Sequence, residues 1–147
     1  MGEWVIRPVA PDDKAAWQRL YEGYQAFYDR HNLPQDFYDT AFDRLVSGDF
    51  HGLVAEDGDT LLGLTHYVFH KNLWRVEGVC YLQDLFTARE ARGTGVGRAL
   101  IEAVYAAADA AGVPNVYWLT QEFNYAGRML YDKVATRTPF IRYSRPL

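Results

Sequence analysis

The sequence predicts a single domain of mixed α/β class over residues 1–147. Segments that alternate like β-strands are interleaved with segments whose apolar residues recur every three or four positions, as on one face of a helix. A chain of this length can form one domain with a substantial core, and no repeat, low-complexity tract or linker divides it. The predicted order is β-αα-βββ-α-β-α-β, which is typical of helices packed on a mixed sheet.

The N-terminal third predicts one short strand followed by two helices. Residues 4–7 form the strand, which ends at Pro8. A helix start follows at Pro11, and an aromatic stripe then continues at helical spacing. The stripe comprises Trp17, Leu20, Tyr21, Tyr24, Phe27 and Tyr28. It is either core throughout or core whose end also forms the wall of a pocket. Beyond the break at Pro34, residues 37–45 predict the second helix.

The remaining chain predicts five strands and two helices. Strands at residues 51–56 and 60–69 are joined by the hairpin turn Asp57-Gly58-Asp59. Residues 78–87 and 116–120 are apolar on both faces, as central strands are. Residues 95–111 give the clearest helical pattern, which Gly112 and Pro114 end. A short helix over residues 124–133 and a strand over residues 140–143 complete the order.

The composition narrows the classes of function. The formal net charge of −4 argues against a general nucleic-acid binder, because binding to phosphates requires basic surfaces. Cys80 is the only cysteine, so neither an intramolecular disulfide nor a cysteine zinc cluster can form. Its apolar neighbours predict a buried, unreactive thiol. No apolar run reaches the length of a membrane span. We expect a cytoplasmic protein with no membrane or nucleic-acid partner.

A glycine-rich loop at residues 87–99 is the strongest functional signal. A strand ends at Thr87 and a helix opens within the loop, so bare main-chain N–H groups and a helix N-terminus together predict a cradle for a pyrophosphate. The G-x-G-x-G spacing, late in the chain, differs from a dinucleotide fingerprint, and a P-loop would end in G-K-[ST]. The remaining alternative is a turn that only begins a helix.

At this loop the sequence resembles the GNAT superfamily of N-acetyltransferases, whose motif [RQ]-x-x-G-x-[GA] is filled by Arg92, Gly95 and Gly97. A second motif also matches, because residues 124–131 (NYAGRMLY) resemble the N…A…LY helix of the family. The resemblance covers nearly the whole chain. It implies a single-domain fold with a central mixed sheet, two splayed parallel strands and flanking helices.

The resemblance also implies a site for acetyl-coenzyme A and no metal ion. The residues implied in cofactor binding are Leu85, Phe86, Thr87, Arg92, Gly93, Thr94, Gly95, Val96, Gly97, Arg98, Asn124, Gly127 and Tyr131. A main-chain N–H near Leu85 would face the thioester oxygen, and Tyr131 would stabilise or protonate the leaving thiolate. Because many relatives are dimers, a homodimer is expected.

Within the superfamily, residues 81–86 (YLQDLF) resemble a strand of the spermidine/spermine and diamine acetyltransferases. Those enzymes carry a Glu, proposed to activate the amine, where this chain has Gln83. The neighbouring Asp84 is the predicted catalytic carboxylate, or else it has a structural partner. Glu77, Glu122, His66 and His70 are further candidates for the base, and a base acting through water would need no dedicated residue.

We therefore predict an acetyl-coenzyme A-dependent N-acetyltransferase acting on a small primary amine that is a polyamine, a diamine or an amino-acid-like molecule. One alternative is acetylation of a protein lysine, which would need an open groove rather than an enclosed aromatic site. The other alternative is a non-catalytic coenzyme A-binding module.

Overall fold

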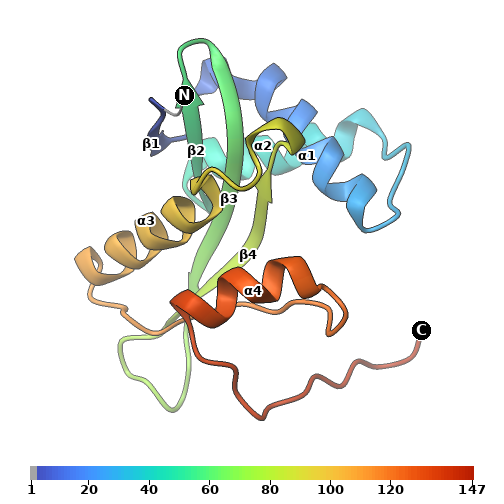
Figure 1. Ribbon diagram of the computed structural model, residues 1–147. Coiled ribbons are helices and arrows are strands. Elements are labelled where there is room, and N and C mark those ends of the chain that lie inside the picture. Colours follow the sequence, from blue (N-terminus) through green and yellow to red (C-terminus); the bar gives the residue numbers. More distant parts are fainter. Residues whose placement is uncertain (1–2) are drawn as a thin grey trace.

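A five-stranded sheet in the order β1-β2-β3-β4-β5 runs through the computed structural model, which describes residues 3–147 (Figure 1). The strands are β1 (Val5–Pro8), β2 (His51–Asp57), β3 (Thr60–His70), β4 (Val79–Thr87) and β5 (Val116–Tyr117). The helices are α1 (Lys14–Phe27), α2 (Gln35–Ser47), α3 (Val96–Ala110) and α4 (Tyr125–Val134), with short 3-10 turns at Pro11–Asp13 and Arg89–Ala91. Neighbours from β1 to β4 are antiparallel, whereas β4 and β5 are parallel. The predicted mixed α/β class is confirmed.

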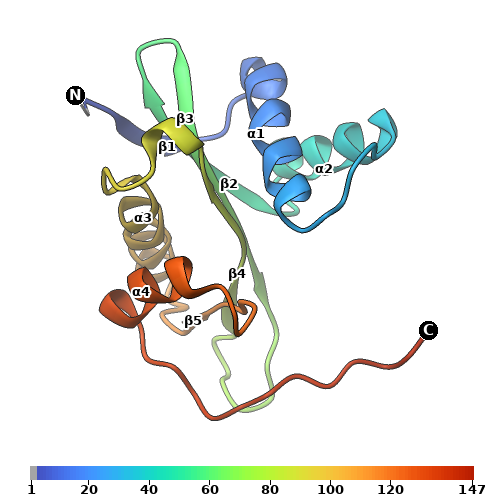
Figure 2. The same cartoon turned by 45° about the vertical axis from the view of Figure 1, so that its right-hand side comes forward.

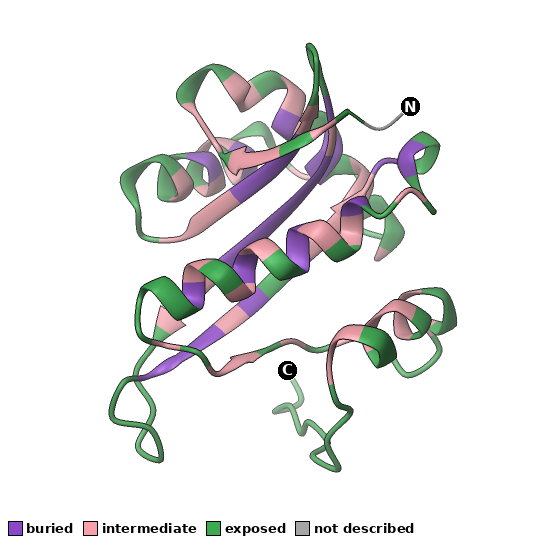
Figure 3. Cartoon of the chain, turned by 60° about the vertical axis from the view of Figure 1, so that its left-hand side comes forward, coloured by how far each residue is buried: buried purple, intermediate pink, exposed green. Residues whose placement is uncertain are grey.

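Helices cover both faces of the sheet, with α1 and α2 on one side and α3 and α4 on the other (Figure 2). Side chains of a strand alternate between faces, and β2 follows this rule: Leu53 and Ala55 join the core beneath α3, while Val54 joins the core beneath α1 and α2. The buried residues accordingly gather along the central strands and the inner side of α3 (Figure 3).

The hairpin between β2 and β3 has its turn where the sequence predicts it. β2 ends at Asp57 and β3 begins at Thr60, and Gly58 adopts a φ of +60°. A residue without a Cβ takes this left-handed conformation without strain. The turn therefore sets the register of β2 against β3, in which Asp57 is paired with Thr60.

The parallel pairing of β4 with β5 is limited to Cys80 with Val116 and Tyr81 with Tyr117. The predicted strand over residues 116–120 is therefore too long, because the chain leaves β4 after Tyr117 and its main chain loses its hydrogen-bonding neighbour. On the side of β4 away from β3, the edge from Leu82 to Thr87 is consequently paired with no strand of the described residues. This divergence opens a fork in the sheet.

The C-terminal tail, residues 135–147, contains no helix or strand, so the strand predicted over residues 140–143 is wrong. The tail runs away from the sheet (Figure 1), and Phe140, Ile141 and Tyr143 are 78%, 77% and 90% exposed. These residues have high strand propensity, but propensity forms a strand only beside a partner. Within the described part of the chain, no strand lies beside these tail residues to serve as a partner.

The single cysteine is fully buried in β4, as predicted, and burial raises the pKa of the Cys80 thiol to about 11. In the part of the chain that the structure describes, none of the helices is long and apolar enough to cross a membrane.

Candidate active site

A pocket lies at the fork between β4 and β5. Its walls come from the end of α1, the middle of β4, the segment after β5, and helices α3 and α4. The lining residues are Tyr24, Tyr28, Leu82, Gln83, Leu85, Ile101, Trp118, Leu119 and Tyr131. These side chains are aromatic, aliphatic or amide groups, and none carries a charge at neutral pH. Such a lining suits a small organic group held by a few directed hydrogen bonds.

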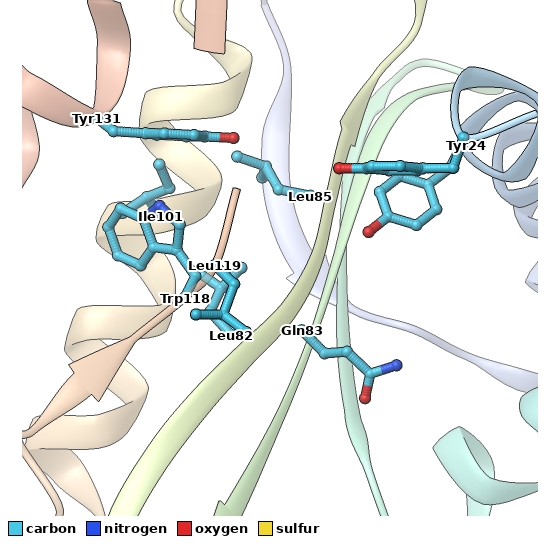
Figure 4. Close-up of a pocket in the computed structure, with 9 residues that line it drawn as sticks. Tyr24, Leu82, Gln83, Leu85, Ile101, Trp118, Leu119 and Tyr131 are labelled. Carbon is cyan, nitrogen blue, oxygen red and sulfur yellow. The ribbon is translucent and has the colours of Figure 1, made fainter. Parts of the chain in front are cut away.

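Two tyrosines face each other across this pocket. The hydroxyl ends of Tyr131 from α4 and Tyr24 from α1 point toward one another, with Leu85 of β4 between them (Figure 4). The Tyr131 ring packs edge-on against Trp118 with centroids 5.5 Å apart, and burial raises the pKa of its phenol. Tyr131 therefore presents a protonated hydroxyl to the pocket, as its predicted role requires.

Sequence reasoning did not assign a role to Tyr24, Trp118 or Leu119, although all three line the pocket. The signal for Tyr24 was its place near the end of the aromatic stripe, where a pocket wall was one of two interpretations. Trp118 and Leu119 belong to the segment that had been predicted as strand. Only the divergence of the two parallel strands brings them to the fork.

The glycine-rich loop leads into the N-terminus of α3. Gly93 and Gly95 have φ values of +79° and +94°, and Gly95 is the residue before the first turn of the helix. A Cβ atom at either glycine would have no heavy atom within 4 Å, so the outer side of the loop is open. Helix geometry leaves the first main-chain N–H groups without an acceptor inside the helix. The loop therefore fits the predicted anion cradle.

The side chains of the loop are largely engaged with the protein itself. Arg92 donates from Nε to the carbonyl oxygen of Thr87 at 3.1 Å, and Arg98 pairs with Glu102 at 3.2 Å. Val96 is buried in the core, and the hydroxyl of Thr94 donates to the carbonyl of Ala91. The main chain is thus the part of the loop that is free to meet an anion. Arg98 could add charge at small cost, because exposed ion pairs contribute little.

Asn124 is the N-cap residue of α4. Its Oδ1 accepts from the main-chain N–H of Gly127 at 3.3 Å, and its Nδ2 donates to Thr120 Oγ1 at 3.0 Å. A Cβ at position 127 would lie 2.6 Å from Nδ2 of Asn124. The glycine is therefore required by the cap. Contact of these two residues with a cofactor stays a prediction.

The end of β4 is held tightly by the elements around it. Leu85 lines the pocket, while the Phe86 ring packs toward α1, 6.2 Å from that of Tyr24. On β3, a Cβ at Gly63 would lie 2.9 Å from the carbonyl oxygen of Phe86, so only glycine permits this close approach of the two strands. The close packing gives residues 85–87 a rigid main chain.

Asp84 is only 5% exposed and does not line the pocket. Its Oδ2 lies 2.8 Å from His66 Nδ1 and accepts a hydrogen bond from the hydroxyl of Tyr21 at 3.0 Å. Asp84 and His66 therefore satisfy each other behind the pocket wall. His70 is exposed and contacts the Tyr117 hydroxyl, while Glu77 and Glu122 are exposed and absent from the lining. The candidate bases are not brought together at the pocket.

Comparison with known proteins identifies the family. Residues 17–135 match the Acetyltransferase (GNAT) family, a range that includes the loop, the fork and Tyr131. The chain belongs to this family and is an N-acetyltransferase that uses acetyl-coenzyme A. Its position in the superfamily agrees with the resemblance carried by Arg92, Gly95 and Gly97.

One curated relative is the D-amino-acid N-acetyltransferase HPA3 of Saccharomyces cerevisiae, which is 39% identical over 145 residues, covering 96% of this chain and 89% of the yeast protein. Among solved structures, a probable acetyltransferase superposes with a TM-score of 0.87 at 20% identity, over 97% of both chains. A ribosomal-protein-alanine N-acetyltransferase from Brucella melitensis gives a TM-score of 0.84 at 19% identity, over 98% of this chain and 99% of its own. The two structural matches support the fold alone. The narrower resemblance to spermidine and diamine enzymes finds no specific support in these relatives.

Proposed function

We propose that this enzyme acetylates the amino group of a small, amino-acid-like amine. The observation that carries the proposal is the neutral, aromatic pocket at the fork, with a phenol on each side. A neutral lining of this kind suits a small organic group, whereas a polycation would be expected to meet carboxylates. The lining, within the described residues, contains no carboxylate.

For the cofactor, we propose that the main chain of residues 85–87 binds the pantetheine and that of residues 92–98 binds the pyrophosphate. The free edge of β4 and the open loop before α3 support this arrangement. A main-chain N–H near Leu85 would stabilise the developing oxyanion, an effect worth about 3 kcal/mol for a well-placed donor. Tyr131 would donate to the departing thiolate. This route draws on amides and a phenol and needs no metal ion.

Two observations favour an amino acid over a polyamine as the acceptor. The position of the Glu found in the polyamine enzymes is occupied by Gln83, which has no proton-accepting carboxylate. In addition, the 39% identical yeast relative is a D-amino-acid N-acetyltransferase. We therefore propose the α-amino group of an amino acid, with the D form first, as the substrate to test.

The experiment is a turnover screen with acetyl-coenzyme A, in which release of free thiol is followed for each acceptor. The panel contains D- and L-amino acids, spermidine, a simple diamine and a lysine-containing peptide. The proposal expects the highest kcat/KM for an amino acid. A preference for spermidine or for the peptide would contradict it, and no amine-dependent thiol release would indicate a coenzyme A-binding module instead.

We further propose a homodimer located in the cytoplasm. The exposed apolar residues of the C-terminal tail support the dimer, because contiguous exposed apolar groups commonly mark contact surfaces. The single cysteine supports the location, since a fold without disulfides suits a reducing compartment.

A further inference from the structure

Three aromatic side chains from three neighbouring strands meet at the base of the fork. The rings of Tyr81 on β4 and Tyr117 on β5 stack with centroids 5.0 Å apart and an interplanar angle of 18°. His70, at the end of β3, lies edge-on to Tyr117 with centroids 5.9 Å apart, and its Nε2 is 2.9 Å from the Tyr117 hydroxyl. We call these three residues the aromatic platform.

The hydrogen bonds of His70 hold the Tyr117 ring in one orientation. Nδ1 of His70 lies 2.9 Å from the carbonyl oxygen of Lys71. Because a carbonyl oxygen can only accept, the proton of the neutral imidazole is on Nδ1, and Nε2 accepts from the Tyr117 hydroxyl. A stack, an edge-on contact and a hydrogen bond thus fix the ring, while Tyr117 remains 37% exposed. A ring that is ordered in advance loses little freedom when a ligand binds to it.

The platform lies on the face of the sheet opposite α3. Cys80 belongs to the core cluster beneath α3, and Val116 packs against that cluster. Successive side chains of a strand point to opposite faces, so Tyr81 and Tyr117 point to the face on which α1 and α2 pack. These helices cover the part of the face nearer the turn between β2 and β3 (Figure 2). The platform is therefore left accessible at the other end.

The platform continues into the pocket along both strands of the fork. Gln83 lies two residues after Tyr81, and Leu119 lies two residues after Tyr117. Both Gln83 and Leu119 line the pocket. The platform and the pocket are therefore neighbouring parts of one surface.

A β-bulge turns Gln83 toward the α1 side of β4. The register of β4 against β3 shifts between His66 and Tyr67, which leaves Gln83 without a partner on β3. Bulges of this kind redirect a side chain. The Gln83 side chain lies on the same side of β4 as Tyr24 and away from Tyr131 (Figure 4). Gln83 therefore joins the pocket to the platform on a single face.

This face is the one from which the acceptor would approach. In the proposed function the sulfur of the thioester lies beside Tyr131, on the side of α3 and α4. The acceptor then reaches the carbonyl carbon from the α1 side, where Tyr24, Tyr28 and Gln83 form the wall of the pocket. With its amino group in the pocket, the rest of the acceptor extends over the adjoining surface.

We propose that the aromatic platform binds the side chain of the acceptor and selects amino acids whose side chain is aromatic. Tyr81 and Tyr117 are the specificity-determining residues, and His70 is the positioning residue that holds Tyr117. Aromatic rings pair favourably in stacked and edge-on arrangements, and the platform contains no carboxylate to neutralise a cationic chain. This inference rests on the proposed acetylation of amino acids and names the side chain that the enzyme prefers.

The test compares D-phenylalanine with D-alanine as acceptors, because the two differ only by the phenyl ring. We expect the wild-type kcat/KM to be at least about tenfold higher for D-phenylalanine. Tyr117→Ala should lower kcat/KM for D-phenylalanine by about 10- to 100-fold and leave that for D-alanine within about threefold. A general loss of structure would lower both values, so the ratio of the two isolates recognition of the ring.

His70→Leu keeps both tyrosines but removes the hydrogen bond to Tyr117, so the ratio should fall by about two- to fivefold. Trp74→Ala is the matched control, because this tryptophan is 87% exposed in the loop between β3 and β4. It should leave the ratio unchanged. Should Tyr117→Ala fail to fold, Tyr117→Leu takes its place, since it removes the ring and keeps a bulky side chain in β5.

Calorimetric titration of D-phenylalanine into the enzyme saturated with coenzyme A gives a readout without turnover. Binding should weaken in Tyr117→Ala and stay unchanged in Trp74→Ala. An unchanged ratio and unchanged binding in the folded Tyr117→Ala enzyme would overturn the role of the platform. An equal loss in Trp74→Ala would do the same, because it would indicate a general surface effect.

The wild-type enzyme alone separates this inference from the proposed function. Equal kcat/KM values for D-phenylalanine and D-alanine would overturn the platform and leave the acetylation of amino acids standing. A preference for D-lysine over D-phenylalanine would overturn the aromatic class, because a cation can also bind to the face of a ring. If the enzyme acetylates no amino acid, the proposed function fails and this inference fails with it.

Discussion

Tyr131 is positioned by its edge-on packing against Trp118, and its burial makes the phenol a weaker acid. Because burial raises its pKa, the phenol is a weaker acid than a free thiol, whose pKa is about 8.5. Full proton transfer to the thiolate is therefore uphill, and stabilisation by a strong hydrogen bond contributes much of the effect. The phenol also stays protonated across the usual assay range, so Tyr131 should cause no loss of kcat up to about pH 10.

We expect Tyr131→Phe to lower kcat by about 10²- to 10⁴-fold, as is typical of a positioned acid–base group. The ring and its packing remain, so acetyl-coenzyme A binding measured by calorimetry should change little. Tyr105→Phe is the matched control, because its hydroxyl donates to the Val134 carbonyl at 2.8 Å away from the pocket. It should cost about 1 kcal/mol of stability and leave kcat intact.

A Tyr131→Phe enzyme with wild-type kcat on a verified acceptor would contradict the role of this phenol as the group that serves sulfur. The kcat of both enzymes should be measured over pH 6–9. If another step, such as product release, limits the rate at one pH, an effect of the variant on the chemical step can still be seen at another pH.

Among the elements, the junction of β4 with α3 is where the proposed role of the glycine-rich loop can be tested. At Gly97, a Cβ would lie 3.4 Å from Leu130 and 3.5 Å from Thr87 Oγ1, which are ordinary contacts. Gly97→Ala should therefore fold and bind acetyl-coenzyme A nearly as well as wild type. Gly97→Val adds branches at the face where the pyrophosphate is proposed to lie, so the KM for acetyl-coenzyme A should rise at least about tenfold.

Thermal melts of both Gly97 variants separate binding from folding. Equal KM values for the alanine and valine enzymes, with both folded, would mean that the loop only begins a helix. That result would also withdraw the cofactor role from the main chain of residues 92–98.

Local patterns predicted most of the elements because their causes are local. The α3 stripe and the glycines before it gave that helix almost to the residue, and the turn at Gly58 gave the hairpin. The strands over residues 116–120 and 140–143 failed for a different reason. A strand needs a partner strand, and local sequence does not show where that partner lies. For residues 116–120 the partner is β4, which pairs with this segment only at Cys80 and Tyr81.

The residues of the candidate site likewise fall into those that a local pattern predicts and those that depend on distant contacts. The family motifs predicted Tyr131 and the loop glycines, because each motif occupies only a short stretch of chain. Tyr24 lies opposite Tyr131 because α1 and α4 pack on opposite sides of β4 and each directs a tyrosine toward the fork. No local sequence pattern contains that information. Asp84 was singled out for its charge, but its partners, His66 and Tyr21, come from β3 and α1.

At the scale of the molecule, acetyl-coenzyme A should stabilise the fold, because its proposed contacts join β4 to the loop and α3. At one hundred times its Kd, a ligand that binds only the folded state adds about 2.7 kcal/mol, which is about 5–10 °C in the melting temperature of a chain of this size. Differential scanning fluorimetry with NAD as the control measures this. An equal shift with NAD would contradict specific recognition of coenzyme A.

The exposed tail gives the proposed dimer a direct test. We expect light scattering to give about twice the chain mass of 16.9 kDa. Replacing Phe140, Ile141 and Tyr143 together by Ser should shift the mass toward the monomer, because it removes the apolar area available for contact. Leu73→Ser with Val76→Ser is the control, since these exposed apolar residues lie in the loop before β4. A monomeric wild-type protein, or equal dissociation of both variants, would contradict a tail-mediated dimer.

The burial of Cys80 has a practical consequence for every assay suggested above. Reagents that detect released coenzyme A react with thiolates, and the only thiol of the chain is 0% exposed with a pKa raised to about 11. The folded enzyme should therefore give almost no background colour. Because Cys80 lies where β4 pairs with Val116, its slow labelling would in turn time the transient separation of the two strands. Cys80 is thus an internal reporter of local opening at the base of the fork.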